Sequence, residues 1–77
     1  MTEVLNKLIA HSAKRYGADP TTLAAGDDIF EKLKIDSFQA VELMSELELE
    51  FDVEIPDYEL QGVNTFGGLA EVIAKRT

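Results

Sequence analysis

Residues 35–51 read IDSFQAVELMSELELEF, and their pattern predicts an amphipathic helix. Asp36 is a good N-cap, and Gln39 follows three residues later, as in a capping box. Ser37 is then the first helical residue, beside backbone N–H groups without partners and at the positive end of the helix dipole. Apolar side chains repeat at helical spacing and are expected in the core: Phe38, Ala40, Val41, Leu43, Met44, Leu47 and Phe51.

The same helix is strongly acidic. Residues 35–74 hold ten Asp and Glu residues and no Lys or Arg, whereas the rest of the chain holds five acids and seven bases, for a net charge of −8. Glu42, Glu46 and Glu50 recur every four residues and share one helix face, with Glu48 alongside. Adjacent like charges on a helix cost roughly 0.2–0.5 kcal/mol per pair, so stability alone would not select them. The acidity favours basic protein partners over nucleic acid.

A first helix and a long loop are predicted before this segment. Thr2 is expected to cap the helix, which runs to Tyr16, and Asp19-Pro20 breaks it because the residue before a proline avoids helical angles. Residues 17–35 follow as a loop whose length is uncommon in so small a domain unless the loop is packed down or functional. A helical turn over 28–33 is expected to pack on the core through Ile29, Phe30 and Leu33.

Two more helices are predicted after residue 51. Pro56-Asp57 opens a short helix from Asp57 to Gln61, and Asn64 or Thr65 caps a last helix. Inward residues of that helix are expected to be Phe66, Leu69, Ala70 and Ile73. The predicted fold class is therefore all-α, a small four-helix bundle of three main helices and one short helix, with a long loop after the first helix.

Composition limits the possible functions. A chain of 77 residues forms one domain, residues 1–77, with a small core and little room for an enclosed substrate cleft. It has no Cys and a single His, so disulfides, thiolate catalysis and zinc sites built from Cys or His are excluded. His11 lies in mid-helix with no acid or nucleophile beside it in sequence, and we expect an ordinary surface or boundary side chain.

Other functional signals are missing from the sequence. No nucleophile–base pair, metal-binding set or phosphate loop is present, so we expect neither a catalytic residue nor a metal site, and no enzyme activity. No signal peptide is visible, and no apolar run approaches ~20 residues. We expect a cytoplasmic monomer that binds no nucleic acid and does not insert into membranes.

Residues 33–43, LKIDSFQAVEL, resemble the phosphopantetheine attachment motif of acyl carrier proteins, usually written L-G-x-D-S-L-x-x-V-E-L. Residues 47–57 resemble the family's following L-E-x-x-F…I-P-D run, and Val63-Asn64-Thr65-Phe66 resembles its V-x-T-[VF] cap. The resemblance covers essentially the whole chain. Four departures favour a specialised carrier over the general fatty-acid carrier: Lys34 in place of glycine, Phe38 in place of leucine, Gln39 in place of a frequent acid, and the apolar Leu49 within the acidic run.

The resemblance implies a carrier function. Ser37 would bear 4′-phosphopantetheine, because its Oγ would attack the β-phosphate of coenzyme A on a separate Mg²⁺-dependent phosphopantetheinyl transferase. The thiol of the arm would then carry acyl groups as thioesters to enzymes of fatty-acid, polyketide or related lipid metabolism. Acyl-loading and acyl-processing enzymes with basic patches are the implied partners. The resemblance also implies a docking strip for these partners, made of Asp36, Glu42, Glu46 and Glu48. The alternative interpretation is that the glutamates form an ordinary solvated helix face and that Asp36 only caps the helix.

Some alternatives stay open. The chain could carry an aminoacyl group, as the D-alanyl carriers of cell-wall modification do, or it could be an acidic helical interaction module that is never modified. The apolar residues of the central helix also have two interpretations. They are core residues, or some of them line a space that admits the acyl chain: Phe38, Val41, Met44 and Leu47.

Overall fold

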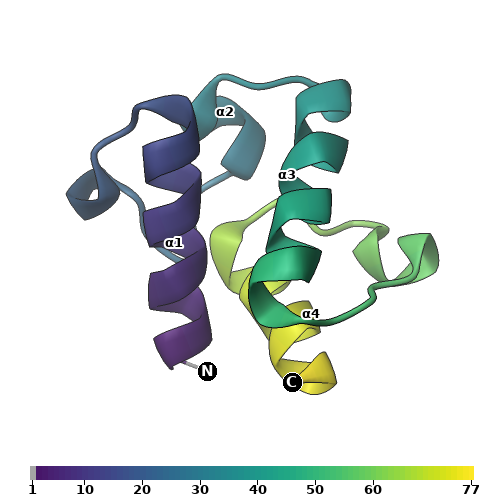
Figure 1. Ribbon diagram of the computed structural model, residues 1–77. Coiled ribbons are helices and arrows are strands. Elements are labelled where there is room, and N and C mark those ends of the chain that lie inside the picture. Colours follow the sequence, from purple (N-terminus) through teal and green to yellow (C-terminus); the bar gives the residue numbers. More distant parts are fainter. Residues whose placement is uncertain (1) are drawn as a thin grey trace.

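The computed structural model describes residues 2–77, which fold into four α-helices and two short 3₁₀ helices. The α-helices are α1 (Thr2–Tyr16), α2 (Ile29–Leu33), α3 (Ser37–Phe51) and α4 (Phe66–Arg76), and the 3₁₀ helices are η1 (Pro20–Thr22) and η2 (Asp57–Leu60). In Figure 1, α1 and α3 run side by side, and α4 packs against α1. The predicted all-α, four-helix fold is confirmed, and none of the helices within residues 2–77 is long and apolar enough to cross a membrane.

Helix α3 begins as the sequence predicts. The Asp36 carboxylate accepts the N–H of Gln39 at 2.9 Å, and the Gln39 side-chain oxygen accepts the N–H of Asp36 at 3.2 Å. This reciprocal pair is a complete capping box, and it makes Ser37 the first residue of the helix. At the other end, Asp52 adopts a left-handed conformation with φ of 55° and closes the helix by donating its N–H to Glu48 and Leu49.

The core lies between α1, α3 and α4 and consists of aliphatic side chains around one phenylalanine. The largest completely buried side chains in the described part of the chain are Leu8, Leu43, Leu47, Phe66 and Ile73. Ser12 is buried among them and donates its hydroxyl proton to the carbonyl of Leu8, which satisfies its polar group.

The short elements differ in detail from the prediction. The expected turn over 28–33 is a capped α-helix, α2, because Asp28 accepts the N–H of Glu31. The expected helix over 57–61 is the 3₁₀ helix η2 and buries none of its residues. Thr65, not Asn64, caps α4, and Thr2 is already a helical residue, so it does not cap α1.

Two residues of α3 that were expected in the core are on the surface, and Phe30 of α2, which was expected to pack on the core, is exposed as well. Phe38 is 73% exposed and Val41 is 65% exposed. The apolar residues of α3 surround most of the helix, but a helix in a small domain buries one stripe only slightly wider than 100°. Leu43 and Leu47 occupy that stripe, and Phe38 and Val41 lie outside it. Placing those two in the core was therefore wrong.

The long loop is packed down by backbone hydrogen bonds to α4 and to the segment just before it, which is one of the two explanations that its length left open. Gly67 donates its N–H to Ala25 at 2.8 Å, and Ile29 donates to the carbonyl of Asn64 at 2.8 Å. The backbone of Gly67 and that of Ala25 approach so closely that a side chain at Gly67 would collide with the carbonyl oxygen of Ala25. These contacts position α2, and with it the start of α3.

Candidate functional site

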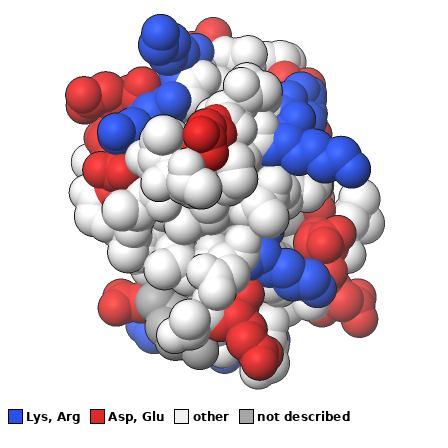
Figure 2. Space-filling view, turned by 90° about the vertical axis from the view of Figure 1, so that its left-hand side faces the viewer, with Lys and Arg blue, Asp and Glu red and all other residues white. Residues whose placement is uncertain are grey.

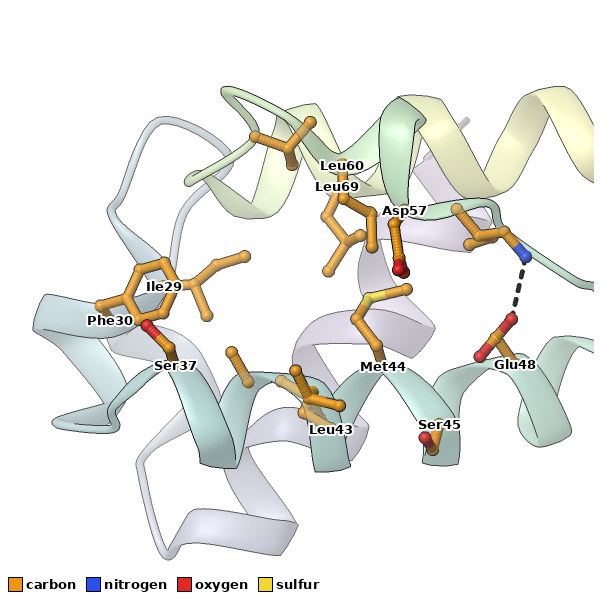
Figure 3. Close-up of a pocket in the computed structure, with 14 residues that line it drawn as sticks. Ile29, Phe30, Ser37, Leu43, Met44, Ser45, Glu48, Asp57, Leu60 and Leu69 are labelled. Carbon is orange, nitrogen blue, oxygen red and sulfur yellow. Dashed lines mark hydrogen bonds between the residues drawn. The ribbon is translucent and has the colours of Figure 1, made fainter.

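Ser37 lies at the exposed start of α3, beside the opening of a cavity. The capping box holds the serine in the first turn of α3, and the aromatic ring of Phe30 from α2 lies next to it (Figure 3). Among the described residues, none forms a hydrogen bond with the Ser37 hydroxyl. The hydroxyl is therefore free to react with a second molecule.

The cavity has a volume of about 350 Å³ and lies between α2, α3, η2 and α4. Its walls are mostly aliphatic, and Met44 projects into it from α3 while Leu60 and Leu69 close the opposite side (Figure 3). Asp57 directs its carboxylate toward Met44. Of the four residues that the sequence left open between core and cavity, Val41 and Met44 line the space, whereas Phe38 and Leu47 do not.

Glu48 has an internal role at the edge of this cavity. Its carboxylate accepts the N–H of Ile55 at 2.9 Å, the bond that is dashed in Figure 3. Ile55 is buried and contributes to the cavity wall. This bond therefore holds the segment that follows α3 against the helix. It also engages Glu48, one of the carboxylates predicted for docking, in a contact within the fold.

Glu46 also makes contacts within the molecule. One of its carboxylate oxygens lies 2.8 Å from His11 Nε2, and the other accepts a hydrogen bond from Arg15 Nε at 2.9 Å. The pKa of Glu46 lies below its ordinary value because hydrogen bonds stabilise the charged carboxylate. The larger effect comes from Arg15 and the smaller from His11. Sequence reasoning missed this link between α1 and α3, since 35 positions separate His11 from Glu46.

The other two predicted docking residues remain at the surface. Glu42 is exposed and has no hydrogen bond or ion pair with any residue in the described range. Asp36 is exposed as well, although one of its carboxylate oxygens serves the cap. Each of the four acids thus has a different environment, and Glu42 is the one with no hydrogen bond or ion pair in the described part of the chain.

An exposed apolar row accompanies Glu42 on the outward face of α3. Phe38 and Val41 belong to it, and Leu49 is 83% exposed. These three residues share one helix face that begins next to Ser37, because positions 38, 41, 45 and 49 follow one another at spacings of three and four, with the polar Ser45 between Val41 and Leu49. The sequence signal for this face was the apolar Leu49 among the acids, whereas Phe38 and Val41 were assigned to the core.

The candidate reactive group of the site is the exposed hydroxyl of Ser37. Residues 2–77 contain no cluster of three or more His, Asp or Glu residues that could hold a metal ion. The hydroxyl lies between an apolar cavity on one side and an acidic, partly apolar helix surface on the other. Such an arrangement suits covalent attachment of a flexible group whose apolar end can enter the cavity.

Comparisons with known proteins give a consistent result. The family model described as "Phosphopantetheine attachment site" matches residues 6–73. An acyl carrier protein of Thermosynechococcus vestitus is 36% identical over 72 residues, which cover 94% of this chain and 89% of that protein. An acyl carrier protein of Rickettsia canadensis is 30% identical over 74 residues, which cover 96% of this chain and 86% of that protein.

Proposed function

Since the chain belongs to the acyl carrier protein family, whose members hold a covalent 4′-phosphopantetheine group and are not themselves enzymes, we propose that Ser37 is the attachment residue. The observation that carries this proposal is the exposed, unbonded hydroxyl of Ser37 at the start of α3, beside the cavity. The serine of the attachment motif is thus also the serine whose hydroxyl is exposed and unbonded, which supports the proposal.

The other two serines of the chain do not fit this role. Ser12 is completely buried, and its hydroxyl is bonded to the carbonyl of Leu8. Ser45 is exposed and also borders the cavity, but it lies in the middle of α3, away from the capped helix start and the attachment motif that surround Ser37.

The attachment is tested by the intact mass of the protein after incubation with coenzyme A and a broad-specificity phosphopantetheinyl transferase. We expect one phosphopantetheine adduct on the wild-type chain and none on Ser37→Ala. Ser45→Ala is the matched control and should be modified as completely as the wild type. An unmodified wild-type chain, or an adduct that persists in Ser37→Ala, would refute the proposal.

The cavity indicates the class of cargo. When attached, the arm supplies a thiol that holds a carboxylic acid as a thioester. The walls near Ser37 are mostly aliphatic and include Ile29, Leu43 and Leu69, so they favour a hydrocarbon chain over a small charged group. We therefore propose acyl cargo for fatty-acid, polyketide or related enzymes, in preference to an aminoacyl group.

The outward face of α3 supports a proposal about partners. Glu42 and Asp36 offer negative charge beside Ser37, and Phe38, Val41 and Leu49 offer apolar contact area. Enzymes that serve the arm are proposed to dock here with a basic rim around an apolar centre, while Glu46 and Glu48 act mainly inside the fold. With a net charge of −8, which opposes self-association, the carrier is proposed to act as a monomer in the cytoplasm.

A further inference from the structure

Lys34 has an unusual backbone conformation close to the proposed attachment residue. It ends α2 with φ of 57° and ψ of 46°, in the left-handed region, and it donates its N–H to the carbonyl of Phe30. Glycine adopts this conformation without steric cost, whereas a side chain with a Cβ does so with difficulty. Glycine would thus end α2 with less strain than lysine, so closing the helix does not by itself explain a lysine at this position.

The charge of Lys34 is not used within the fold. Ion pairs in the described part of the chain engage Lys7, Arg15, Lys32 and Arg76, and none engages Lys34. Its side chain is exposed. Lys34 is also the last basic residue before the long acidic stretch, because the next one in sequence is Lys75.

The link between α2, which ends at Leu33, and α3, which begins at Ser37, is short and keeps Lys34 close to Ser37. Three residue steps separate their Cα atoms by at most about 11 Å, and the lysine side chain extends about 6 Å from its own Cα. Ile35 is buried and Asp36 is held in the capping box, so the link is anchored at both residues between them. A group attached to the Ser37 hydroxyl thus lies within reach of the Lys34 ammonium.

We propose that Lys34 pairs with the phosphodiester of the phosphopantetheine arm, an inference that rests on the proposed attachment at Ser37. Attachment replaces a neutral hydroxyl with a permanent negative charge beside the carboxylate of Asp36. Lys34 offsets that repulsion and restrains the root of the arm. It is a positioning residue, because it contacts the phosphate and not the thiol at which cargo is bound.

A competing explanation makes a different prediction. A cation at the C-terminal end of α2 also interacts favourably with the helix dipole, with no arm attached. If that were the whole role of Lys34, its removal would change the stability of the unmodified and the modified chain equally. The arm-pairing role requires a larger effect in the modified chain.

The test is a double-mutant cycle in which the second change is the modification itself. Wild type, Lys34→Gln, Lys34→Arg and Lys32→Gln are each prepared with and without the arm, and intact mass confirms the state of each sample. Glutamine and arginine keep the Cβ, so the backbone strain is the same in all variants at position 34. Lys32→Gln removes an equal charge from the same helix.

Chemical denaturation then gives the folding equilibrium constant of each sample. We expect Lys34→Gln to lower this constant about two- to fivefold more in the modified than in the unmodified chain, the range typical of an exposed ion pair. Lys34→Arg and Lys32→Gln should show no such difference, and the difference for Lys34→Gln should shrink as salt is added. The ³¹P resonance of the phosphodiester should also shift in Lys34→Gln.

Failure of this inference can be told from failure of the proposed function. If no variant takes up the arm, the attachment at Ser37 is refuted. If the arm attaches and Lys34→Gln has equal effects in both forms with an unchanged ³¹P resonance, the pairing is refuted. A change that appears only in the rate of reaction with partner enzymes would also overturn it, because Lys34 would then bind an acidic group of the partner.

Discussion

Glu42 and Glu46 lie one turn apart on α3, yet the structure gives them different surroundings. Glu46 joins α3 to α1 through His11 and Arg15, whereas Glu42 contacts no charged partner within residues 2–77. The excess of glutamates on this helix therefore has two physical reasons. One carboxylate stabilises the packing of two helices, and another remains available to a partner.

Replacing Glu46 by Gln should destabilise the fold, and replacing Glu42 should not. A partly exposed ion pair contributes about 0.5–1 kcal/mol to the free energy of unfolding. We therefore expect Glu46→Gln to lower the free energy of unfolding by about that amount in urea denaturation at pH 7. The folded-state pKa of Glu46 is lowered, so its contribution is present above the unfolded value of about 4.3 and is lost as the pH falls through the folded value. The difference in free energy of unfolding between the wild type and Glu46→Gln should therefore disappear at low pH.

Glu42→Gln is the matched control for that experiment and should change stability by less than about 0.5 kcal/mol. It should instead slow loading by the transferase at low salt, with the difference narrowing as salt screens the charge. Equal stability losses in both variants, or a loss for Glu46→Gln that persists at low pH, would contradict the assignment of roles.

At the scale of elements, the junction between the long loop and α4 depends on one glycine. A Cβ at Gly67 would lie 2.9 Å from the carbonyl oxygen of Ala25 and 3.1 Å from its Cβ. Alanine normally favours a helix over glycine by up to about 1 kcal/mol, but a backbone collision costs more, about 1–3 kcal/mol. We expect Gly67→Ala to destabilise the protein by about 1–2 kcal/mol in thermal or urea unfolding.

Gly26→Ala provides the control on the same loop. A Cβ at Gly26 meets nothing within 4 Å, so this variant should be neutral or slightly stabilising, by up to about 1 kcal/mol. If both substitutions were equally tolerated, the close approach of the loop to α4 would not be a determinant of the fold.

The elements that the sequence predicts well are those defined by local chemistry. The Asp36–Gln39 capping box, the start of α3 at Ser37 and the end of α1 at Tyr16, where Gly17 has a left-handed φ of 70°, involve residues at most three positions apart. The detail of η2 was less predictable. Its form as a 3₁₀ helix with no buried residue depends on how the chain returns from α3 to α4, which no local motif specifies.

At the scale of the whole molecule, acidic and basic residues are separated along the chain more than they are in space. Figure 2 shows the face on the side of α1, where blue and red side chains are interspersed. Residues 35–74, which include all of α3, contain no Lys or Arg. Helix α3 therefore has only acidic charges of its own, although Lys7 and Arg15 of α1 pair with its Glu50 and Glu46. The exposed Glu42 remains available to a basic partner.

The cavity should protect a long acyl chain more than a short one. Burial of a CH₂ group contributes about 0.8 kcal/mol, so inserting even two methylene groups favours the sequestered chain roughly tenfold. We expect the thioester of a long saturated acyl group on the wild-type carrier to hydrolyse about tenfold more slowly than an acetyl thioester. Ala40→Leu, which adds bulk at the cavity wall, should reduce that difference.

Ala10→Leu is the control, because Ala10 is exposed on α1 and distant from the cavity lining. It should leave both hydrolysis rates unchanged. Equal lability of the long and the short thioester on the wild-type carrier would show that the chain is not sequestered, and the cavity would then have no part in holding cargo.

The sequence by itself determined the helical class, the start of α3 and the position of Ser37 in its first turn, because these depend on periodicity and on contacts between near neighbours. It also determined that the acids are concentrated in residues 35–74, which contain no Lys or Arg. Only the tertiary structure decided which side of α3 faces inward, that Glu46 meets His11 and Arg15, and that a cavity opens beside Ser37. These features arise where segments distant in sequence pack together, and one helix with apolar residues on several sides can be packed in more than one orientation until its neighbours are in place.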